Sequence, residues 1–161
     1  MTGSFMLRSP PRIKVLEAAG CIGDKRYVLQ PLITGGARAR VRSSDGSKTY
    51  RVVVVPRTDY IVEAYSNDNG TRYRRYIGYP ILCVMMLLDL LPRNRRVEEA
   101  LAGVPWKELN ERYKRYSIVE DIVLREYASK KGVSPEEILE YRDQVMRELE
   151  RYKVYYRGDL A

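Results

Sequence analysis

The sequence predicts an α+β protein: an antiparallel sheet of four to five strands, at about 26–78, packs on helices and precedes a helical C-terminal half. Two patterns indicate this fold. Apolar and polar residues alternate with a period of two before Tyr79, and a helical period replaces it after Pro80. Hydrophobic residues make up 45% of the 161 residues, which is enough for a folded core.

Charge is divided unevenly along the chain. Residues 1–80 carry 14 Lys/Arg and 6 Asp/Glu, whereas residues 81–161 carry 15 of each. The whole formal net charge of +8 therefore lies in the half that is expected to form the sheet. A basic excess of this size favours a polyanionic partner, either nucleic acid or an anionic membrane surface.

The first half is predicted to contain one short helix and two hairpins. The helix, at 12–20, ends at Gly20, and a strand at 27–33 contains Pro31, which places it at a sheet edge or a bulge. Each hairpin has a turn sequence, Asp45-Gly46 in the first and Asn69-Gly70 in the second. The hairpin strands are predicted at 37–42, 49–55, 60–66 and 71–77.

The second half is predicted to be helical. The segment between Pro80 and Pro92 is apolar on every face, so it is expected to be buried against the sheet. Ser134 is a typical N-cap, with Glu137 placed to complete a capping box. Helices are expected at about 80–92, 96–102, 105–131 with a break near 117, and 134–156. This divides the chain into an α+β domain at 12–130 and an amphipathic helix at 134–156.

The first candidate site is a row of arginines in the first hairpin. Arg38, Arg40 and Arg42 are two residues apart, so all three lie on one face of the strand. A two-residue turn at Asp45-Gly46 pairs Arg40 with Arg51 and adds that arginine to the face. Like charges opposite each other destabilise a sheet, and an anion that bridges them removes this cost. A merely solvated outer face explains the pattern equally well.

The second candidate site combines arginines with tyrosines. A turn at Asn69-Gly70 pairs Tyr65 with Arg74, and exposes both on one face. Arginine neutralises phosphate, and bases stack on aromatic rings, which are the two needs of a single-strand binder. A shift of the register by one residue exposes Tyr73 instead. The nucleic-acid site predicted from both hairpins comprises Arg38, Arg40, Arg42, Arg51, Tyr65, Arg72, Arg74, Arg75 and Tyr76.

The C-terminal helix carries an apolar seam with alternating spacings of three and four residues, interrupted at Arg142. The seam either packs on the protein itself or pairs with a second chain. Because the rest of the helix is highly polar, we expect a homo-oligomer. The residues expected at its interface are Ile138, Val145, Leu149, Tyr152 and Tyr156.

Catalytic and cofactor sites are not expected. The chain has no histidine, which removes the commonest general base and zinc ligand, and it contains no phosphate-loop motif. Its turn carboxylates are scattered, so we expect no metal, no cofactor and no enzymatic activity. Cys21 and Cys83 are read as buried free thiols, with one disulfide as the alternative.

The protein is expected to be cytoplasmic. Its first residues do not form a signal peptide, and its longest apolar run, 81–91, is too short to span a membrane. A composition rich in Lys, Arg and Glu but poor in Gln and Asn is typical of a hyperthermophile.

Two short motifs resemble a known family. Gly78-Tyr79-Pro80 with the apolar segment after it, and the segment 103–110 around Trp106, are similar to the ThermoDBP-related proteins of hyperthermophilic archaea. The resemblance covers roughly 13–125. It implies an antiparallel sheet packed with helices, a nucleic-acid cleft with an apolar floor and basic rims, and oligomerisation through the C-terminal helix.

These observations predict non-catalytic, largely sequence-independent binding of single-stranded DNA or RNA. Two alternatives remain open. One is a duplex-binding transcription regulator, with a small helical motif at 12–20 and a wing at 38–51. The other is a nucleic-acid-processing enzyme that uses acidic residues and a metal ion.

Overall fold

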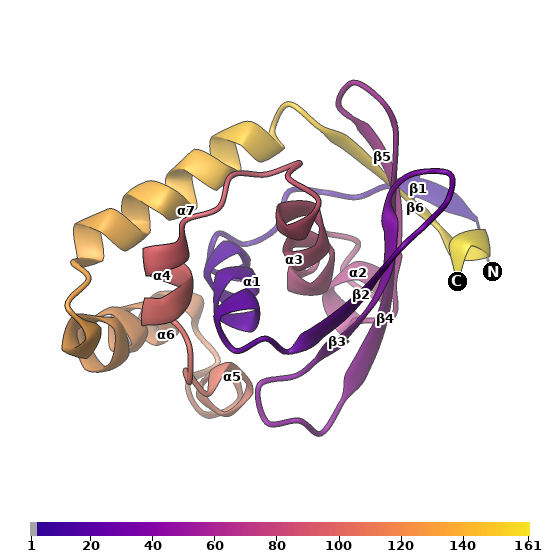
Figure 1. Ribbon diagram of the computed structural model, residues 1–161. Coiled ribbons are helices and arrows are strands. Elements are labelled where there is room, and N and C mark those ends of the chain that lie inside the picture. The colour runs from indigo at the N-terminus through magenta and orange to yellow at the C-terminus, as the bar shows by residue number, and fades with distance from the viewer. Residues whose placement is uncertain (1–2) are drawn as a thin grey trace.

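The structure is a computed structural model, and it describes residues 3–161. Within this range six strands form one mixed sheet in the order β1-β6-β5-β4-β3-β2 (Figure 1). All neighbouring pairs are antiparallel except β5 and β6, which are parallel. The prediction of α+β is confirmed, but a sheet of four to five antiparallel strands is wrong. The strands are β1 (Ser4–Met6), β2 (Tyr27–Pro31), β3 (Ala37–Arg42), β4 (Thr49–Thr58), β5 (Ile61–Ser66) and β6 (Lys153–Arg157).

The helices gather on one side of this sheet (Figure 1). Helix α6 continues into a π-helical turn at Val123–Ala128 and a 3-10 turn at Ser129–Lys131, and a last 3-10 turn, Gly158–Leu160, follows β6. The α-helices are α1 (Ile13–Gly23), α2 (Asn69–Arg72), α3 (Tyr79–Leu87), α4 (Arg95–Ala100), α5 (Trp106–Tyr113), α6 (Tyr116–Ile122) and α7 (Pro135–Leu149).

The core lies between the sheet and helices α1 and α3. Helix α3 packs against β3, β4 and β5, and its side chains Leu82, Met85 and Met86 are completely buried. The prediction that the apolar segment after Pro80 is buried against the sheet is therefore confirmed. Helix α1 packs on α3 and separates it from α4 and α7, so the helices form two layers over one sheet face.

The first predicted hairpin has the expected register. Strands β3 and β4 pair Arg42 with Thr49, Arg40 with Arg51, and Ala39 with Val52. Burial alternates along β3, with the arginines exposed and the small residues buried. The alternation of Arg with Ala and Val therefore fixes both the register and the face of this hairpin.

The second predicted hairpin does not exist. Strand β5 instead pairs with β4 across a tight turn at Asp59-Tyr60, and Tyr65 lies opposite Val53 rather than Arg74. The predicted strand at 71–77 is the short helix α2 followed by a single bridge between Tyr76 and Arg8. Residues 69–72 form a helix instead of a hairpin turn because the side chain of Asp68 caps α2.

The C-terminal helix is shorter than predicted, because α7 ends at Leu149 and β6 begins at Lys153. No glycine or proline marks the end of α7 in the sequence. Tyr152 and Tyr156 follow Leu149 at spacings of three and four residues, so the helical pattern extends into the strand. Ile138, Val145 and Leu149 are buried in the chain's own core, so the prediction that they lie at an interface with a second chain is wrong.

The two tyrosines of the predicted seam also contact their own chain. Tyr152 donates a hydrogen bond to the Leu90 carbonyl, 2.8 Å between the oxygens. Tyr156 belongs to β6 and stacks on Phe5 with ring centroids 4.8 Å apart. The whole segment predicted as an oligomerisation arm at 134–156 is thus part of the core and the sheet.

Candidate nucleic-acid interface and an adjoining pocket

The outer face of the first hairpin carries four arginines. Arg38, Arg40 and Arg42 project from β3, and Arg51 projects from β4 opposite Arg40. All four side chains are exposed, and none forms an ion pair with any of residues 3–161. We call this set the arginine face. Four adjacent guanidinium groups without carboxylate partners make a surface suited to several phosphate groups.

On its side of the sheet, the arginine face is exposed to solvent, whereas the rest of that side is partly covered. On the neighbouring strand Val28 pairs with Arg40 and is 72% exposed, an apolar side chain between cations. Farther along the same sheet face Val53, Val55 and Tyr65 form a small separate cluster that Leu32 and Leu160 cover. The sheet surface is therefore accessible at β2 and β3 and at the start of β4.

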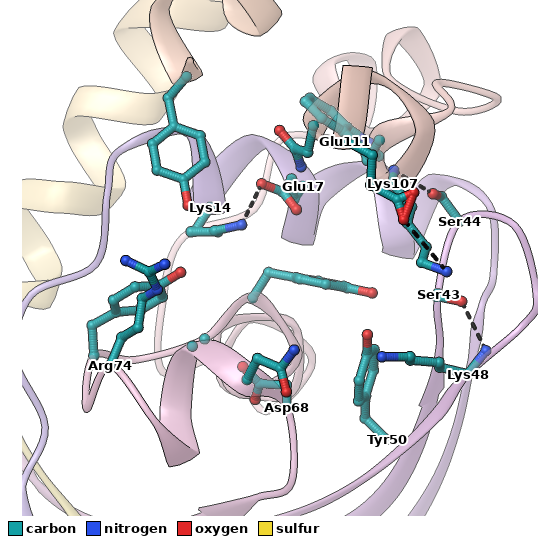
Figure 2. Close-up of a pocket in the computed structure, with 18 of the residues that line it drawn as sticks. Lys14, Glu17, Ser43, Ser44, Lys48, Tyr50, Asp68, Arg74, Lys107 and Glu111 are labelled. Carbon is teal, nitrogen blue, oxygen red and sulfur yellow. Dashed lines mark hydrogen bonds and ion pairs between the residues drawn. The ribbon is translucent and has the colours of Figure 1, made fainter. Parts of the chain in front are cut away.

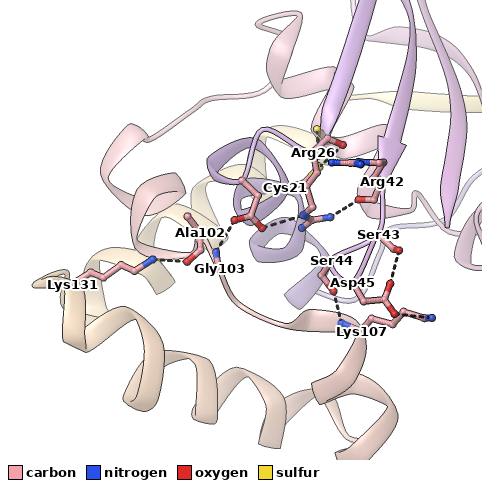
Figure 3. A network of polar contacts seen from close by, with 12 residues as sticks. Cys21, Arg26, Arg42, Ser43, Ser44, Asp45, Ala102, Gly103, Lys107 and Lys131 are labelled. Atoms are coloured by element: carbon pink, nitrogen blue, oxygen red, sulfur yellow. Dashed lines mark hydrogen bonds and ion pairs between the residues drawn. The ribbon is translucent and has the colours of Figure 1, made fainter. Parts of the chain in front are cut away.

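Polar contacts tie the hairpin to the helices behind it (Figure 3). Arg26 pairs with Asp24 at 3.0 Å and donates to the carbonyl of Arg42 at the end of β3. In the turn, the Ser44 hydroxyl accepts a hydrogen bond of 2.8 Å from the backbone N–H of Lys107 in α5. These contacts attach the hairpin of the arginine face to the segment after α1 and to α5.

Asp45 organises the turn itself. Its carboxylate accepts from the backbone N–H and hydroxyl of Ser47 and from the hydroxyl of Ser43, and the Lys107 ammonium lies 3.2 Å away. These donors, the Ser47 backbone first, hold the pKa of Asp45 well below its usual value. The carboxylate predicted only as part of a turn is therefore an ionised link between the turn and α5.

The second predicted group is split by the structure. Tyr65 and Tyr76 are 8% and 9% exposed, so neither ring lies on an exposed basic face. The placement of both tyrosines beside the arginines is wrong, because residues 69–72 are helical and reverse the chain differently from a hairpin. Tyr73, the tyrosine of the alternative register, is 72% exposed and lies beside Arg72, 5.5 Å from guanidinium carbon to ring centroid.

Three arginines of this second group are exposed but do not join the arginine face as strand neighbours. Arg72, Arg74 and Arg75 lie in α2 and the segment after it, outside the sheet. Arg75 covers the ring of Phe5 at 4.4 Å, and Arg74 lines a pocket. The structure therefore brings together only Arg38, Arg40, Arg42 and Arg51 of the predicted nucleic-acid site.

The buried carboxylate of Asp68 explains the path of this segment. It accepts hydrogen bonds from the Thr71 backbone N–H at 3.1 Å, from the Thr71 hydroxyl at 2.9 Å and from Ser66. Gly78 packs against the same carboxylate, and a Cβ there would lie 2.2 Å from its oxygen. An aspartate N-cap thus replaces the hairpin turn that Asn69-Gly70 suggested.

The segment after β5 closes one side of a pocket with a volume of about 490 Å³ (Figure 2). Helix α1 contributes Lys14 and Glu17, the first hairpin contributes Lys48 and Tyr50, and the start of α5 lies across from them. Arg74 and Lys48 lie on opposite sides of the pocket in this view. Both side chains are exposed, and neither pairs with a carboxylate of the described chain.

A buried ion pair lies at the wall of the pocket. The Lys14 ammonium is 2.9 Å from the Glu17 carboxylate, and the two side chains are 13% and 4% exposed. Burial alone would lower the pKa of Lys14, but the Glu17 carboxylate outweighs it and raises that pKa above its usual value. The Lys14 ammonium and the Glu17 carboxylate therefore both line the cavity.

Tyrosine rings supply the remaining walls. Tyr50, Tyr76, Tyr79 and Tyr116 all line the pocket. The Tyr50 and Tyr79 rings meet edge to face, with centroids 6.2 Å apart, and the Lys14 ammonium lies 5.1 Å from the Tyr116 ring centroid. Burial raises the pKa of Tyr76 and of Tyr79, so both hydroxyls keep their protons and act as neutral hydrogen-bonding groups.

Helix α5 contributes four residues to the lining, of which Trp106 and Asn110 each carry a buried polar atom. The Asn110 side-chain oxygen is buried and has no hydrogen-bond partner in residues 3–161. The indole of Trp106, which is the only tryptophan of the chain, is 2% exposed, and its N–H packs against Gly20. The Trp106 N–H likewise has no hydrogen-bond partner in residues 3–161, so α5 carries one buried donor and one buried acceptor that are unsatisfied, which is costly inside a protein.

Other candidate chemistry is not assembled in the described chain. Cys21 and Cys83 are buried free thiols with sulfur atoms 3.8 Å apart. In the part of the chain that the structure describes, no three His, Cys, Asp or Glu side chains come close enough to hold a metal ion. Residues 3–161 also contain no helix with the length and apolarity needed to cross a membrane.

Sequence reasoning missed the pocket because five separate segments build it. Only one local signal was present: Lys14 and Glu17 are charged residues three apart in a helix whose other residues at 13–22 are apolar or small. Charges at such positions are rarely buried without a partner, and their pairing could have been inferred. The contribution of Asn110 could not, because it depends on how α5 packs.

Comparison with known proteins identifies the family of the chain. No curated protein and no solved structure gave a significant match. The family described as "Uncharacterised conserved protein UCP014422" matches residues 7–155, which is nearly the whole chain. The match includes the arginine face, the pocket and α7. This protein therefore belongs to the UCP014422 family of uncharacterised conserved proteins.

Proposed function

We propose that this protein binds single-stranded nucleic acid, DNA or RNA, without catalysis and largely independently of sequence. The observation that carries the proposal is the arginine face, four exposed guanidinium groups on two paired strands without an ion-pair partner in residues 3–161. Arg40 and Arg51 lie directly opposite each other, an arrangement that is unfavourable in the free protein. A phosphate between them converts that repulsion into attraction.

The distribution of charge supports the same partner. Arginines in other parts of the chain pair with carboxylates. Examples are Arg93 with Glu98 and Arg142 with Glu120, at 2.9 and 2.8 Å. In these places the sequence supplies a carboxylate for each guanidinium group. On the arginine face it supplies none, and the net charge of the first half remains to be neutralised by an external polyanion.

The shape of the surface favours a single strand over a duplex. The arginines lie on an open sheet face beside the exposed Val28, and sheet faces of this kind bind extended single strands in other modules. The duplex-binding alternative needs a presented helix in the segment 12–20, but in α1 the residues from Val15 to Ile22 are buried. The resemblance to ThermoDBP-related proteins agrees with a single-stranded ligand.

Fluorescence anisotropy with the full chain tests the proposal. Labelled single-stranded DNA, single-stranded RNA and duplex DNA of about 20 nucleotides each are titrated at about 0.1 M salt. We expect both single strands to bind more tightly than the duplex. The triple replacement of Arg38, Arg40 and Arg42 by alanine should weaken single-strand binding roughly 100-fold. Phosphates that no longer contact an arginine keep their condensed counterions, so fewer counterions are released on binding.

A matched variant controls for total charge. Arg95, Arg115 and Arg147 are also exposed, unpaired within the described chain, and lie in the helical half. Their simultaneous replacement by alanine removes the same three charges and is expected to change affinity only a few-fold. Equal reductions of affinity in the two triple variants, or tighter binding of the duplex, would contradict the proposal.

A further inference from the structure

We infer that the pocket beside the first hairpin is a nucleotide site, which takes one unpaired base inside and its phosphate group at the basic rim. The inference deepens the proposed function, on which it rests for the source of the nucleotide. The arginine face binds the backbone of a strand, whereas the pocket is suited to a single residue of that strand.

The size and charge of the pocket suit a nucleotide. Its volume of about 490 Å³ falls in the range of sites that bind small organic ligands, roughly 300–1,000 Å³. Arg74 and Lys48 are exposed cations of the lining that form no ion pair within residues 3–161, and they lie on opposite sides of the cavity in Figure 2. A phosphate at the rim would meet a guanidinium or an ammonium group without displacing an existing ion pair.

The interior suits a base rather than a second phosphate. The Glu17 and Asp68 carboxylates would repel an anion placed inside, but they accept hydrogen bonds from the N–H groups of a base. Lys14 and the neutral hydroxyls of Tyr76 and Tyr79 can donate to ring nitrogens and carbonyl oxygens. The tyrosine rings supply flat apolar surface for the base itself.

Asn110 gives an independent indication of a ligand. Its side-chain oxygen is buried, lines the pocket and lacks a donor in the described chain. Every nucleobase carries at least one N–H group that can supply this donor. The buried Trp106 N–H also lacks a partner in the described chain, but it packs against Gly20 in the core, so only the Asn110 oxygen is assigned to a ligand.

The selection of single strands follows from this arrangement. A base can enter a pocket of this kind only when it is free of its complement and of its stacking neighbours, which costs least in a single strand. The Ser43–Lys48 turn, which joins β3 to β4, belongs both to the hairpin of the arginine face and to the pocket lining. The pocket thus strengthens the preference for single strands that the open arginine face already favours.

The single tryptophan makes the site measurable in the full chain. Trp106 lines the pocket, so its emission is expected to change saturably when a nucleoside 5′-monophosphate is titrated. Inorganic phosphate should bind at least about tenfold more weakly, since it lacks the base. An unlabelled single-stranded oligonucleotide should compete with the mononucleotide, and a duplex should compete poorly. Competition by the strand identifies the nucleotide's source as nucleic acid.

Three variants locate the site. Asn110→Leu removes the unpartnered acceptor, so it is expected to leave the Tm of the free protein unchanged or raised, while nucleotide affinity falls about tenfold. A purely structural asparagine would instead lower the Tm. Arg74→Ala should weaken the nucleotide several-fold but leave the corresponding nucleoside, which has no phosphate, unaffected. Arg95→Ala, on α4, is the matched control and should change neither the nucleotide affinity nor the nucleoside affinity.

The outcomes separate this inference from the proposed function. Absence of any emission or Tm change with mononucleotide, or binding that Asn110→Leu and Arg74→Ala leave intact, would overturn the nucleotide site. If single strands still bind through the arginine face, only this inference fails. If mononucleotides bind but strands of either kind do not, the proposed function fails and the pocket remains a site for a free nucleotide.

Discussion

On the arginine face, four guanidinium groups are exposed and have no carboxylate partner within residues 3–161, whereas in the pocket the Lys14 ammonium and Glu17 carboxylate pair beside tyrosine rings. The two regions share the hairpin turn but hold charge in opposite ways. A paired and buried charge is part of the folded structure, so its removal costs stability. An unpaired and exposed charge contributes little to stability, so its removal is expected to weaken ligand binding and to leave the free energy of unfolding almost unchanged. The following predictions compare the regions on this basis.

The largest expected effect is on the buried pair. Glu17→Ala leaves the Lys14 ammonium buried without its partner, and is expected to lower the free energy of unfolding by about 3 kcal/mol. Urea unfolding followed by circular dichroism measures the change. Glu111→Ala is the control, because this carboxylate is mostly exposed and 3.9 Å from Lys107, and it should change stability by less than about 0.5 kcal/mol. Similar values for both variants would contradict the buried pairing.

A smaller effect is expected from the cap of α2. Asp68→Ala removes the acceptor of the Thr71 backbone and hydroxyl hydrogen bonds and is expected to cost about 2 kcal/mol of unfolding free energy. Asp68→Asn keeps one acceptor oxygen and should lower stability less. If residues 67–77 formed a hairpin instead, both substitutions would fall on an exposed turn and leave stability almost unchanged.

The smallest effect is expected on the arginine face. Arg40 lies opposite Arg51, whereas Arg38 lies opposite Val53, so only Arg40→Gln relieves a repulsion between strands. At low salt Arg40→Gln is expected to be more stable than Arg38→Gln by about 0.3 kcal/mol. Thermal unfolding of the two variants gives the difference, which should vanish near 1 M salt. A difference that salt does not change would show that repulsion is not its cause.

The two regions also differ in how far the sequence reveals them. The register of the first hairpin followed from its sequence because every second residue is arginine and a one-residue shift would bury those charges. The next segment has an equally strong turn sequence, Asn69-Gly70, yet Asp68 turns it into a helix through hydrogen bonds to Thr71. Local turn preference and side-chain capping compete there, and the sequence alone does not decide between them.

The ends of the chain show a second limit. Val154, Tyr155 and Tyr156 are good strand formers, but their tyrosine spacing continued the seam of α7 and hid the strand. Pairing of β6 with both β1 and β5 joins residues separated by most of the chain. The pocket was missed for the same reason, since contacts between distant segments leave no periodic pattern in the sequence.

The most direct test of the arginine face is the salt dependence of single-strand binding. The logarithm of the association constant is plotted against the logarithm of salt concentration, between about 50 and 200 mM, for the wild type and for the variant with Arg38, Arg40 and Arg42 replaced by alanine. Removing three arginines that each neutralise one phosphate should flatten the slope by about 2, at roughly 0.7 per phosphate on a single strand. The control variant of Arg95, Arg115 and Arg147 should keep the wild-type slope. An unchanged slope in the first variant would contradict the assignment of nucleic-acid binding to this face.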